Sequence, residues 1–187
     1  MEQLKLNIID TSEVKIIASA AYNFRIELII NLGKDDLEDI FMISDDLAQI
    51  FDNSFLLNEK NISKYFNKNT LPFVARYKGQ IIGYIIGIPI EFFKEEAWAR
   101  HDRNMGKNNT IYTYAFIMKE KYRNVGGYAK TLKRIYLNWA KKNGFKYVTG
   151  HVKQGITQKF KGNIEIIKIF PKWYSSNLPF EFYRRNL

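Results

Sequence analysis

The stretch KYRNVGGYAKTL, residues 121–132, places two adjacent glycines at the start of a segment that otherwise has strong helical character. Glycine lowers helix propensity, so its presence here indicates a backbone position that must lack a side chain or must adopt a positive φ. A helix that opens behind glycines presents unpaired backbone N–H groups together with the positive end of its dipole. The stretch therefore predicts a site for an anion such as pyrophosphate, with an ordinary strand-to-helix turn as the alternative.

Composition limits the number of domains, the cysteine and metal chemistry and the cellular location that we expect for the protein. The chain has 187 residues, 46% of them hydrophobic and 16% aromatic, which suits one folded domain over 1–187. It has no cysteine and two histidines, which excludes disulfides, thiolate metal sites and a cysteine nucleophile and disfavours a structural metal centre. No apolar run of about eighteen residues and no secretory leader occurs, so we expect a cytoplasmic protein that does not enter a membrane.

The net charge of +10 is concentrated in the last third of the chain. Residues 119–187 hold 16 Lys and Arg against 3 Asp and Glu, whereas residues 1–118 hold 13 against 16. A positive field that begins at the glycine pair suits a polyanionic partner, either a nucleotide-like cofactor or a nucleic-acid backbone. A solvated, lysine-rich surface is the alternative interpretation.

The hydrophobic pattern predicts a series of strands and helices. Strands over 71–77 and 80–93, joined by a hairpin at Lys78 and Gly79, are rich in β-branched and aromatic residues. The clearest helix follows the glycine pair and ends before Gly144; its apolar stripe comprises Ala129, Leu132, Ile135, Tyr136, Trp139 and Ala140. The other expected elements are one or two strands over 14–31, helices over 34–55, 58–68 and 162–170, and strands over 110–118, 145–152 and 179–187.

This order of elements resembles the GNAT superfamily of acyl-CoA N-acyltransferases, in which a strand leads through a polar turn to an RxxGxG/A motif and a long helix. The phosphate motifs GxGxxG and GxxxxGK[ST] are absent. Phe116 and Met118 match the hydrophobic pair of that strand, Arg123 and Gly126 match the motif, and Asn163 matches a later Asn that opens a further helix. The resemblance covers about residues 71–185. In this chain Tyr128 takes the place of the second motif glycine, unless Gly127 does its work, and Phe170 takes the place of a tyrosine that many relatives use as a general acid.

The resemblance implies a single GNAT-like α/β domain, with a mixed, mostly antiparallel sheet flanked by helices and a splayed strand pair for acyl-CoA. Residues 1–70 would form the acceptor side, and residues 71–187 the acyl-CoA core and the C-terminal strand. The implied co-substrate is acetyl-CoA or a short relative, whose acyl group passes to an amine without a covalent enzyme intermediate. The implied contact residues are Phe116, Ile117, Met118, Arg123, Asn124, Val125, Gly126, Gly127, Tyr128, Ala129 and Asn163.

An amine acceptor must lose its proton, because an unperturbed lysine-like amine has a pKa of about 10.4. His151 is the preferred catalytic candidate, since histidine has a reference pKa of about 6.5. Tyr112 is the second candidate because it lies eleven residues before Arg123, where some relatives place a catalytic Glu. Each has a structural alternative, as a hydrogen-bonded histidine or a half-buried strand aromatic; Tyr114, His101 and Tyr183 are weaker candidates.

The early predicted helix is strongly acidic, which would attract a cationic amine, although a solvated helix face is the alternative. Its acids are Asp35, Asp36, Glu38, Asp39, Asp45, Asp46 and Asp52. Two rival functions stay open. One is a nucleic-acid-binding module built from the basic last third and aromatics such as Trp139, Trp173, Tyr174 and Phe182, although Trp139 lies on the apolar stripe and suits the core better. The other is a non-catalytic relative that binds CoA.

Overall fold

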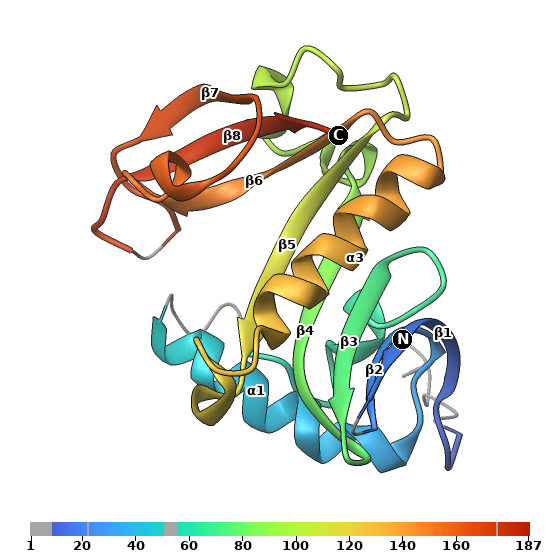
Figure 1. The fold of residues 1–187 in the computed structure, drawn as a ribbon. Coiled ribbons are helices and arrows are strands. Elements are labelled where there is room, and N and C mark those ends of the chain that lie inside the picture. The colour runs from blue at the N-terminus through green and yellow to red at the C-terminus, as the bar shows by residue number, and fades with distance from the viewer. Residues whose placement is uncertain (1–8, 22, 51–55, 175) are drawn as a thin grey trace, which may run out of the picture. The chain divides into compact units, whose positions relative to one another are not determined.

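Eight strands form one mixed sheet in the computed structural model. The structure describes residues 9–21, 23–50, 56–174 and 176–187 (Figure 1). The strand order is β1-β2-β3-β4-β5-β6-β8-β7. Strands β5 and β6 run parallel, whereas the pairs β1–β2, β2–β3, β6–β8 and β7–β8 are antiparallel. The predicted fold class, a mixed and mostly antiparallel sheet with flanking helices, is confirmed.

The strands are β1 (Glu13–Ala20), β2 (Phe24–Asn31), β3 (Leu71–Tyr77), β4 (Gln80–Pro89), β5 (Thr110–Met118), β6 (Tyr147–Lys153), β7 (Ile164–Phe170) and β8 (Phe180–Asn186). The helices are α1 (Leu37–Ile50), α2 (Ile62–Tyr65) and α3 (Tyr128–Lys142), with short 3₁₀ turns between elements. Among the described residues, no helix has the length and apolar character needed to cross a membrane.

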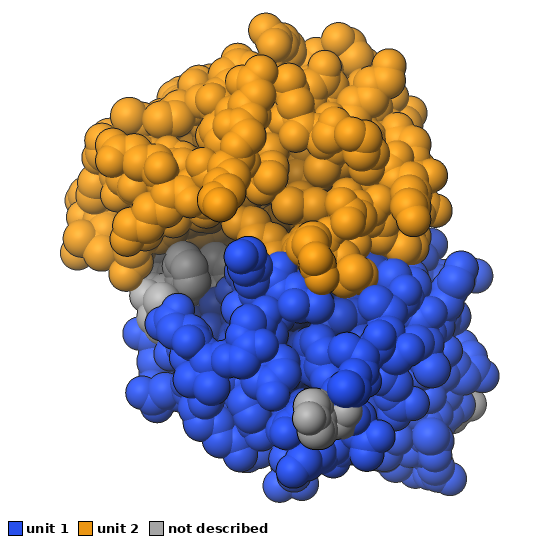
Figure 2. Space-filling view, in the orientation of Figure 1, with its two compact units in different colours: residues 1–86, 116–132 blue, residues 87–115, 133–187 orange. Residues whose placement is uncertain are grey.

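The chain divides into two compact units (Figure 2). Unit 1 comprises residues 1–86 and 116–132, and unit 2 comprises residues 87–115 and 133–187. Strands β4 and β5 and helix α3 contribute residues to both units. The expectation of one domain over 1–187 stays a prediction.

Unit 1 is built on β1–β3, the first part of β4 and helix α1. Helix α1 buries Ile40, Ile43 and Leu47 at helical spacing. The β3–β4 hairpin turns at Lys78 and Gly79, whose φ angles of 51° and 85° suit the tight turn that the sequence predicted. In this unit Arg76 donates hydrogen bonds of 2.8 Å to buried Asp36 and Glu27, so its charge is neutralised locally.

Unit 2 is built on the hairpin of β7 and β8, with β6 and the first part of β5 beside it. Strand β8 lies between two neighbours, and all of Phe180–Arg184 is buried. Arg184 donates hydrogen bonds to Asp102 at 2.7 Å and to Glu165 at 2.6 Å. These bonds attach the 94–109 connection to the β7–β8 hairpin.

The helix expected over 162–170 is wrong, because this segment is the edge strand β7. A short apolar run rich in isoleucine has no periodicity that distinguishes a helix from a strand. Its β-branched residues favour a strand when a neighbouring strand can pair with it. That partner is β8, which pairs with β7 from Ile164↔Arg185 to Phe170↔Phe180. Asn163 is therefore an exposed residue before a strand, and the resemblance to a helix-opening Asn is lost.

Candidate functional site

The turn between β5 and α3, here called the glycine turn (residues 124–127), has an unusual backbone. Asn124, Gly126 and Gly127 have φ angles of 59°, 62° and 67°, three left-handed residues within four positions. Asparagine and glycine are the residues that adopt this conformation at the lowest energy. Val125 and both glycines are exposed.

Helix α3 begins directly after this turn. The N–H of Thr131 donates to the Gly127 carbonyl at 2.9 Å, which closes the first helical turn. The first N–H groups of a helix have no intrahelical acceptor. In the described part of the chain the N–H groups of Gly126, Gly127 and Ala129 donate no backbone–backbone hydrogen bond. These donors lie at the start of α3, at the positive end of the helix dipole, and the binding of an anion here stays a prediction.

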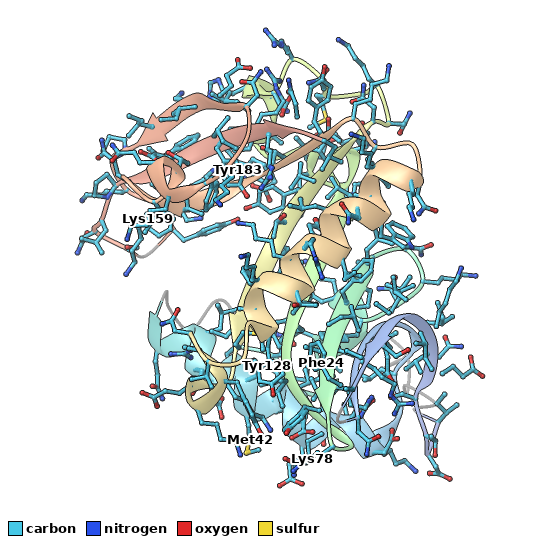
Figure 3. The ribbon with its side chains drawn as sticks, viewed as in Figure 1. Phe24, Met42, Lys78, Tyr128, Lys159 and Tyr183 are labelled. Carbon is cyan, nitrogen blue, oxygen red and sulfur yellow. The ribbon has the colours of Figure 1, made fainter. Side chains whose placement is uncertain are left out.

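Tyr128 explains why the motif departs from RxxGxG/A. Its ring packs against Phe24 and Tyr77, with ring centroids 4.9 Å and 5.4 Å away, and Figure 3 shows it beside Phe24 at the start of α3. A Cβ on Gly126 would lie 2.5 Å from Cε2 of this ring, whereas a Cβ on Gly127 would have no atom within 4 Å. Gly126 thus makes room for Tyr128, and the open face of the glycine turn lies at Gly127.

Arg123 does not point freely into solvent. Its Nε donates to the Met118 carbonyl at 2.8 Å, and its Nη2 donates to Asp46 at 3.0 Å. The side chain therefore attaches the glycine turn to the end of β5 and to α1. Because Asp46 compensates its charge, Arg123 is not a free cation at the turn.

The parallel pairing of β5 and β6 is short. It runs from Thr110↔Tyr147 to Thr113↔Gly150, and neither strand pairs with the other beyond these residues. Strand β5 nevertheless continues to Met118, and β6 continues to Lys153 while still paired with β8. The sequence candidates at the end of β5 differ in burial: Phe116 is half-buried, whereas Ile117 and Met118 are buried.

The two catalytic candidates meet in unit 2. The Tyr112 hydroxyl lies 3.0 Å from Nδ1 of His151, within hydrogen-bonding distance. The imidazole is stacked between Trp173, with centroids 3.4 Å apart, and Phe182, with centroids 4.6 Å apart. Its Nε2 is buried and has no partner among the described residues.

Burial in this aromatic surround lowers the pKa of His151 to about 2. The expectation that His151 titrates near neutral pH is therefore wrong: the imidazole is neutral throughout the physiological range. Burial also raises the pKa of Tyr112 well above its usual value. The pair is a neutral, hydrogen-bonded contact between β5 and β6.

The weaker candidates lie in different surroundings. His101 Nε2 is 2.8 Å from Lys168 Nζ at an exposed position. Tyr183 is buried, which raises its pKa to about 12, and Tyr114 is half-buried. Phe170 lies on β7, with its ring centroid 5.5 Å from that of His151.

Most of the acidic residues of the early helix have partners inside unit 1. Asp36 pairs with Arg76, Asp39 with Lys119, and Asp46 with Arg123, while Asp35 accepts the Ser12 N–H at 2.9 Å. Glu38 and Asp45 are exposed, and Asp52 lies outside the described residues. The attraction of a cationic acceptor by this helix stays a prediction that now rests mainly on Glu38 and Asp45.

The sequence pattern did not indicate that tryptophan encloses His151. Trp173 and Phe182, which the nucleic-acid alternative assigns to base stacking, are 7% and 0% exposed and enclose His151. Trp98 completes the surround, with its ring edge-on to His151 at 5.0 Å. No local signal identified these contacts, because the three aromatics come from separate segments.

Comparison with known proteins gives a consistent picture. The sequence model of a family described as "Acetyltransferase (GNAT) family" matches residues 35–157. A search of curated proteins gave no match. Many solved structures share the fold.

An N-acetyltransferase from Staphylococcus aureus Mu50 is 17% identical, with a TM-score of 0.60, covering 88% of this chain and 98% of that one. A GNAT family acetyltransferase from Elizabethkingia anophelis with acetyl-CoA bound is 17% identical, with a TM-score of 0.55 and coverage of 88% and 99%. The ribosomal-protein-S18-alanine N-acetyltransferase from Escherichia coli is 11% identical, with a TM-score of 0.56 and coverage of 87% and 93%.

Proposed function

The chain belongs to the GNAT acetyltransferase family, and from this premise we propose that it transfers an acetyl or short acyl group from acyl-CoA to an amine. Acetyl-CoA is the donor that the family uses, and the solved structure from Elizabethkingia anophelis holds it. The observation that carries the proposal is the glycine turn, whose exposed N–H groups at the start of α3 suit a pyrophosphate.

The residues of the glycine turn would hold the donor through backbone groups. Gly127, whose Cβ direction is open, supports close approach of a phosphate, and Ala129 supplies a further N–H at the helix terminus. The short β5–β6 pairing supports a role for main-chain groups of these strands in binding the pantetheine arm. Asn163 has no place in this proposal, because the helix on which its assignment depended is absent.

The chemical step is direct attack of a neutral amine on the thioester carbonyl. The C–N bond forms first and gives a tetrahedral oxyanion, and the C–S bond then breaks. The proton that the nitrogen gives up passes through water to the leaving thiolate, which departs as CoA. A backbone N–H near the thioester would stabilise the oxyanion. No covalent bond to the enzyme is needed.

Neither His151 nor Tyr112 is suited to accept the amine proton. A neutral imidazole with a pKa of about 2 is too weak a base, and a buried phenol with a raised pKa is not ionised at neutral pH. We assign this pair to the orientation of β5 and β6 rather than to proton transfer. The amine must then arrive neutral or lose its proton to water, so kcat/KM should rise with pH toward the pKa of the acceptor.

Two measurements test the proposal. Thermal unfolding with acetyl-CoA and longer acyl-CoAs should show stabilisation that grows as RT ln(1 + [L]/Kd). A panel of amines, read out by release of free thiol, should then identify an acceptor. Absence of any acyl-CoA binding would refute the assignment, and binding without turnover for every amine would favour a non-catalytic CoA-binding relative.

A further inference from the structure

Net charge is distributed unevenly between the two units. Unit 1 contains 13 Lys and Arg against 13 Asp and Glu, whereas unit 2 contains 16 against 6, so unit 2 carries the whole net charge of +10. Like charges on one surface repel one another, and a bound polyanion relieves this repulsion. The glycine turn does not account for the surplus, because all of its residues belong to unit 1.

Part of this surplus lies along the unit 2 part of helix α3. The helix exposes Arg134, Lys141 and Lys142, which are residues i, i+7 and i+8. Because an α-helix has 3.6 residues per turn, these positions fall on one side of it. The other side packs into the core through Tyr136 and Ala140, which are at most 1% exposed. The three cations therefore form a row along the exposed side of α3.

Two lysines outside the helix extend this row. The N–H of Lys146, four residues after the end of α3, donates to the Asn109 carbonyl at 2.8 Å, so the segment 107–109 lies beside the chain that leaves the helix. Lys107 and Lys146 are both exposed. We call this group the basic surface, and its members are Lys107, Arg134, Lys141, Lys142 and Lys146.

No acid in the described part of the chain forms an ion pair with the basic surface. None of the ion pairs there includes any of its five cations. One acid adjoins the surface: Glu91 accepts the Asn108 N–H at 2.8 Å through Oε1, and its Oε2 is buried. The helix dipole favours a basic last turn, but it does not account for the two lysines outside the helix.

An exposed aromatic side chain lies in the same part of unit 2. Phe92 follows Glu91 in the 3₁₀ turn Ile90–Phe93 and is 62% exposed. The hydrogen bond from Asn108 to Glu91 places this turn beside the segment that carries Lys107. Surfaces that combine cations with exposed aromatics bind single-stranded nucleic acids, whose phosphates contact the cations and whose unstacked bases stack on the rings.

The spacing of the cations suits a nucleic-acid strand. Arg134 and Lys142 are eight residues apart on α3, about 12 Å along its axis at 1.5 Å per residue. This length matches about three to four nucleotides at about 3.4 Å each. A membrane surface fits less well, because a helix that lies on lipid inserts its apolar side. The apolar side of α3 packs into the protein core, and between its exposed cations the helix presents Asn138.

We propose that the basic surface binds single-stranded nucleic acid, with its cations at the phosphates and a base stacked on Phe92. The binding reads the backbone rather than the base sequence, since contacts of lysine and arginine with phosphate carry no sequence information. The inference goes beyond the proposed acyl transfer and does not depend on it. An acidic protein offers carboxylates to the same cations and is the alternative that the experiment must separate.

The test is fluorescence anisotropy of the full chain with labelled single-stranded DNA of about 12 nucleotides and mixed sequence, at about 50 to 300 mM KCl. If about three to five phosphates are contacted, log Kobs should fall with log[KCl] at a slope of about −2 to −3.5, since each contact contributes about 0.7. In the triple variant Arg134→Gln, Lys141→Gln, Lys142→Gln the slope should become shallower by about 2, and affinity at about 50 mM KCl should fall at least about tenfold.

The matched control removes the same charge from other exposed lysines of unit 2, in Lys94→Gln, Lys161→Gln, Lys172→Gln. Its slope should stay at the wild-type value, because the phosphate contacts are confined to the basic surface. Phe92→Ala should lower affinity about fivefold or more with an unchanged slope, because stacking releases no counterion. Phe92→Tyr keeps an aromatic ring and should retain the wild-type affinity. Unchanged affinity in Phe92→Ala would contradict the part assigned to this ring.

Calorimetric titration with acetyl-CoA separates this inference from the proposed function. The triple variant should bind acetyl-CoA as the wild type does, because none of its three positions belongs to the glycine turn. Loss of acetyl-CoA affinity in parallel with loss of DNA binding would assign the cations to the donor and overturn the inference. Failure of the wild type to bind acetyl-CoA would refute the proposed function and leave the DNA measurement to decide the inference.

Three other results would overturn the inference. The first is absence of DNA binding by the wild type, or equal losses in the triple variant and its control. The second is binding of poly-glutamate that is lost in the triple variant, with no effect of Phe92→Ala on the DNA, which would assign the surface to an acidic protein. The third is binding of phosphatidylserine vesicles that is lost in the triple variant, without DNA binding, which would assign the surface to a membrane.

Discussion

Replacement of Gly126 by alanine should disrupt the glycine turn by two separate effects. The residue has a φ of 62°, which costs a non-glycine residue about 1–2 kcal/mol. Its Cβ would also lie 2.5 Å from Cε2 and 2.8 Å from Cζ of Tyr128, so the ring would have to leave its contacts with Phe24 and Tyr77. Overpacking of this kind typically costs about 1–3 kcal/mol.

Gly127→Ala is the matched control because Gly127 has nearly the same φ, 67°, and open space around its Cβ direction. Urea unfolding without ligand should show that the free energy of unfolding falls by about 1–2 kcal/mol in Gly127→Ala and by about 2–5 kcal/mol in Gly126→Ala. These are upper values, because relaxation of the turn would reduce both losses. In a Tyr128→Ala background the two variants should cost the same. The resulting coupling energy between Gly126 and Tyr128 should be about 1–3 kcal/mol.

A free turn that relaxes its strain must regain the left-handed backbone when acetyl-CoA binds, at a cost of about 1 kcal/mol. Affinity for acetyl-CoA, measured by calorimetry, should therefore fall about fivefold in either glycine variant. Both proteins should remain folded, since the turn is at the surface. A folded Gly126→Ala protein with unchanged affinity would refute the assignment of the glycine turn to pyrophosphate binding. A coupling energy near zero would refute the explanation of Gly126 by the Tyr128 ring.

Three further perturbations test other parts of the structure. The pKa of His151 is about 2 in the fold and about 6.5 when unfolded, so its stabilising effect is present above pH 6.5 and is lost as pH falls; urea titrations should show a loss of about 2 kcal/mol by pH 5 that is absent in His151→Phe. Arg123→Lys should weaken acetyl-CoA binding about tenfold by calorimetry, because lysine has no fork to bond the Met118 carbonyl and Asp46 together; wild-type affinity would contradict this role. Asp102→Asn leaves the charge of Arg184 with Glu165 alone and should cost about 3–5 kcal/mol of unfolding free energy, seen as a lower Tm, whereas adding Arg184→Met should recover most of the loss.

The sequence was most informative where the deciding interactions are local. Turn chemistry predicted the hairpin at Lys78 and Gly79, which both adopt positive φ. The apolar stripe and the terminal Gly144, with a φ of 88°, predicted helix α3 within a residue or two. The glycine pair predicted an unusual backbone at 126 and 127, because few residues other than glycine occupy that region.

Tertiary structure decided the features that depend on distant partners. Residues 164–170 became a strand because β8 offers a partner for the ladder, and a seven-residue apolar run does not by itself distinguish strand from helix. Arg123 was expected to contribute charge, but Asp46, far along the chain, determines how that charge is compensated. His151 has the reference pKa of a base that works near neutral pH, yet Trp173 and Phe182 exclude water from its ring and keep it neutral. Residue type sets the reference pKa, whereas desolvation is a property of the packed surroundings, which exist only after segments separated in sequence have folded together.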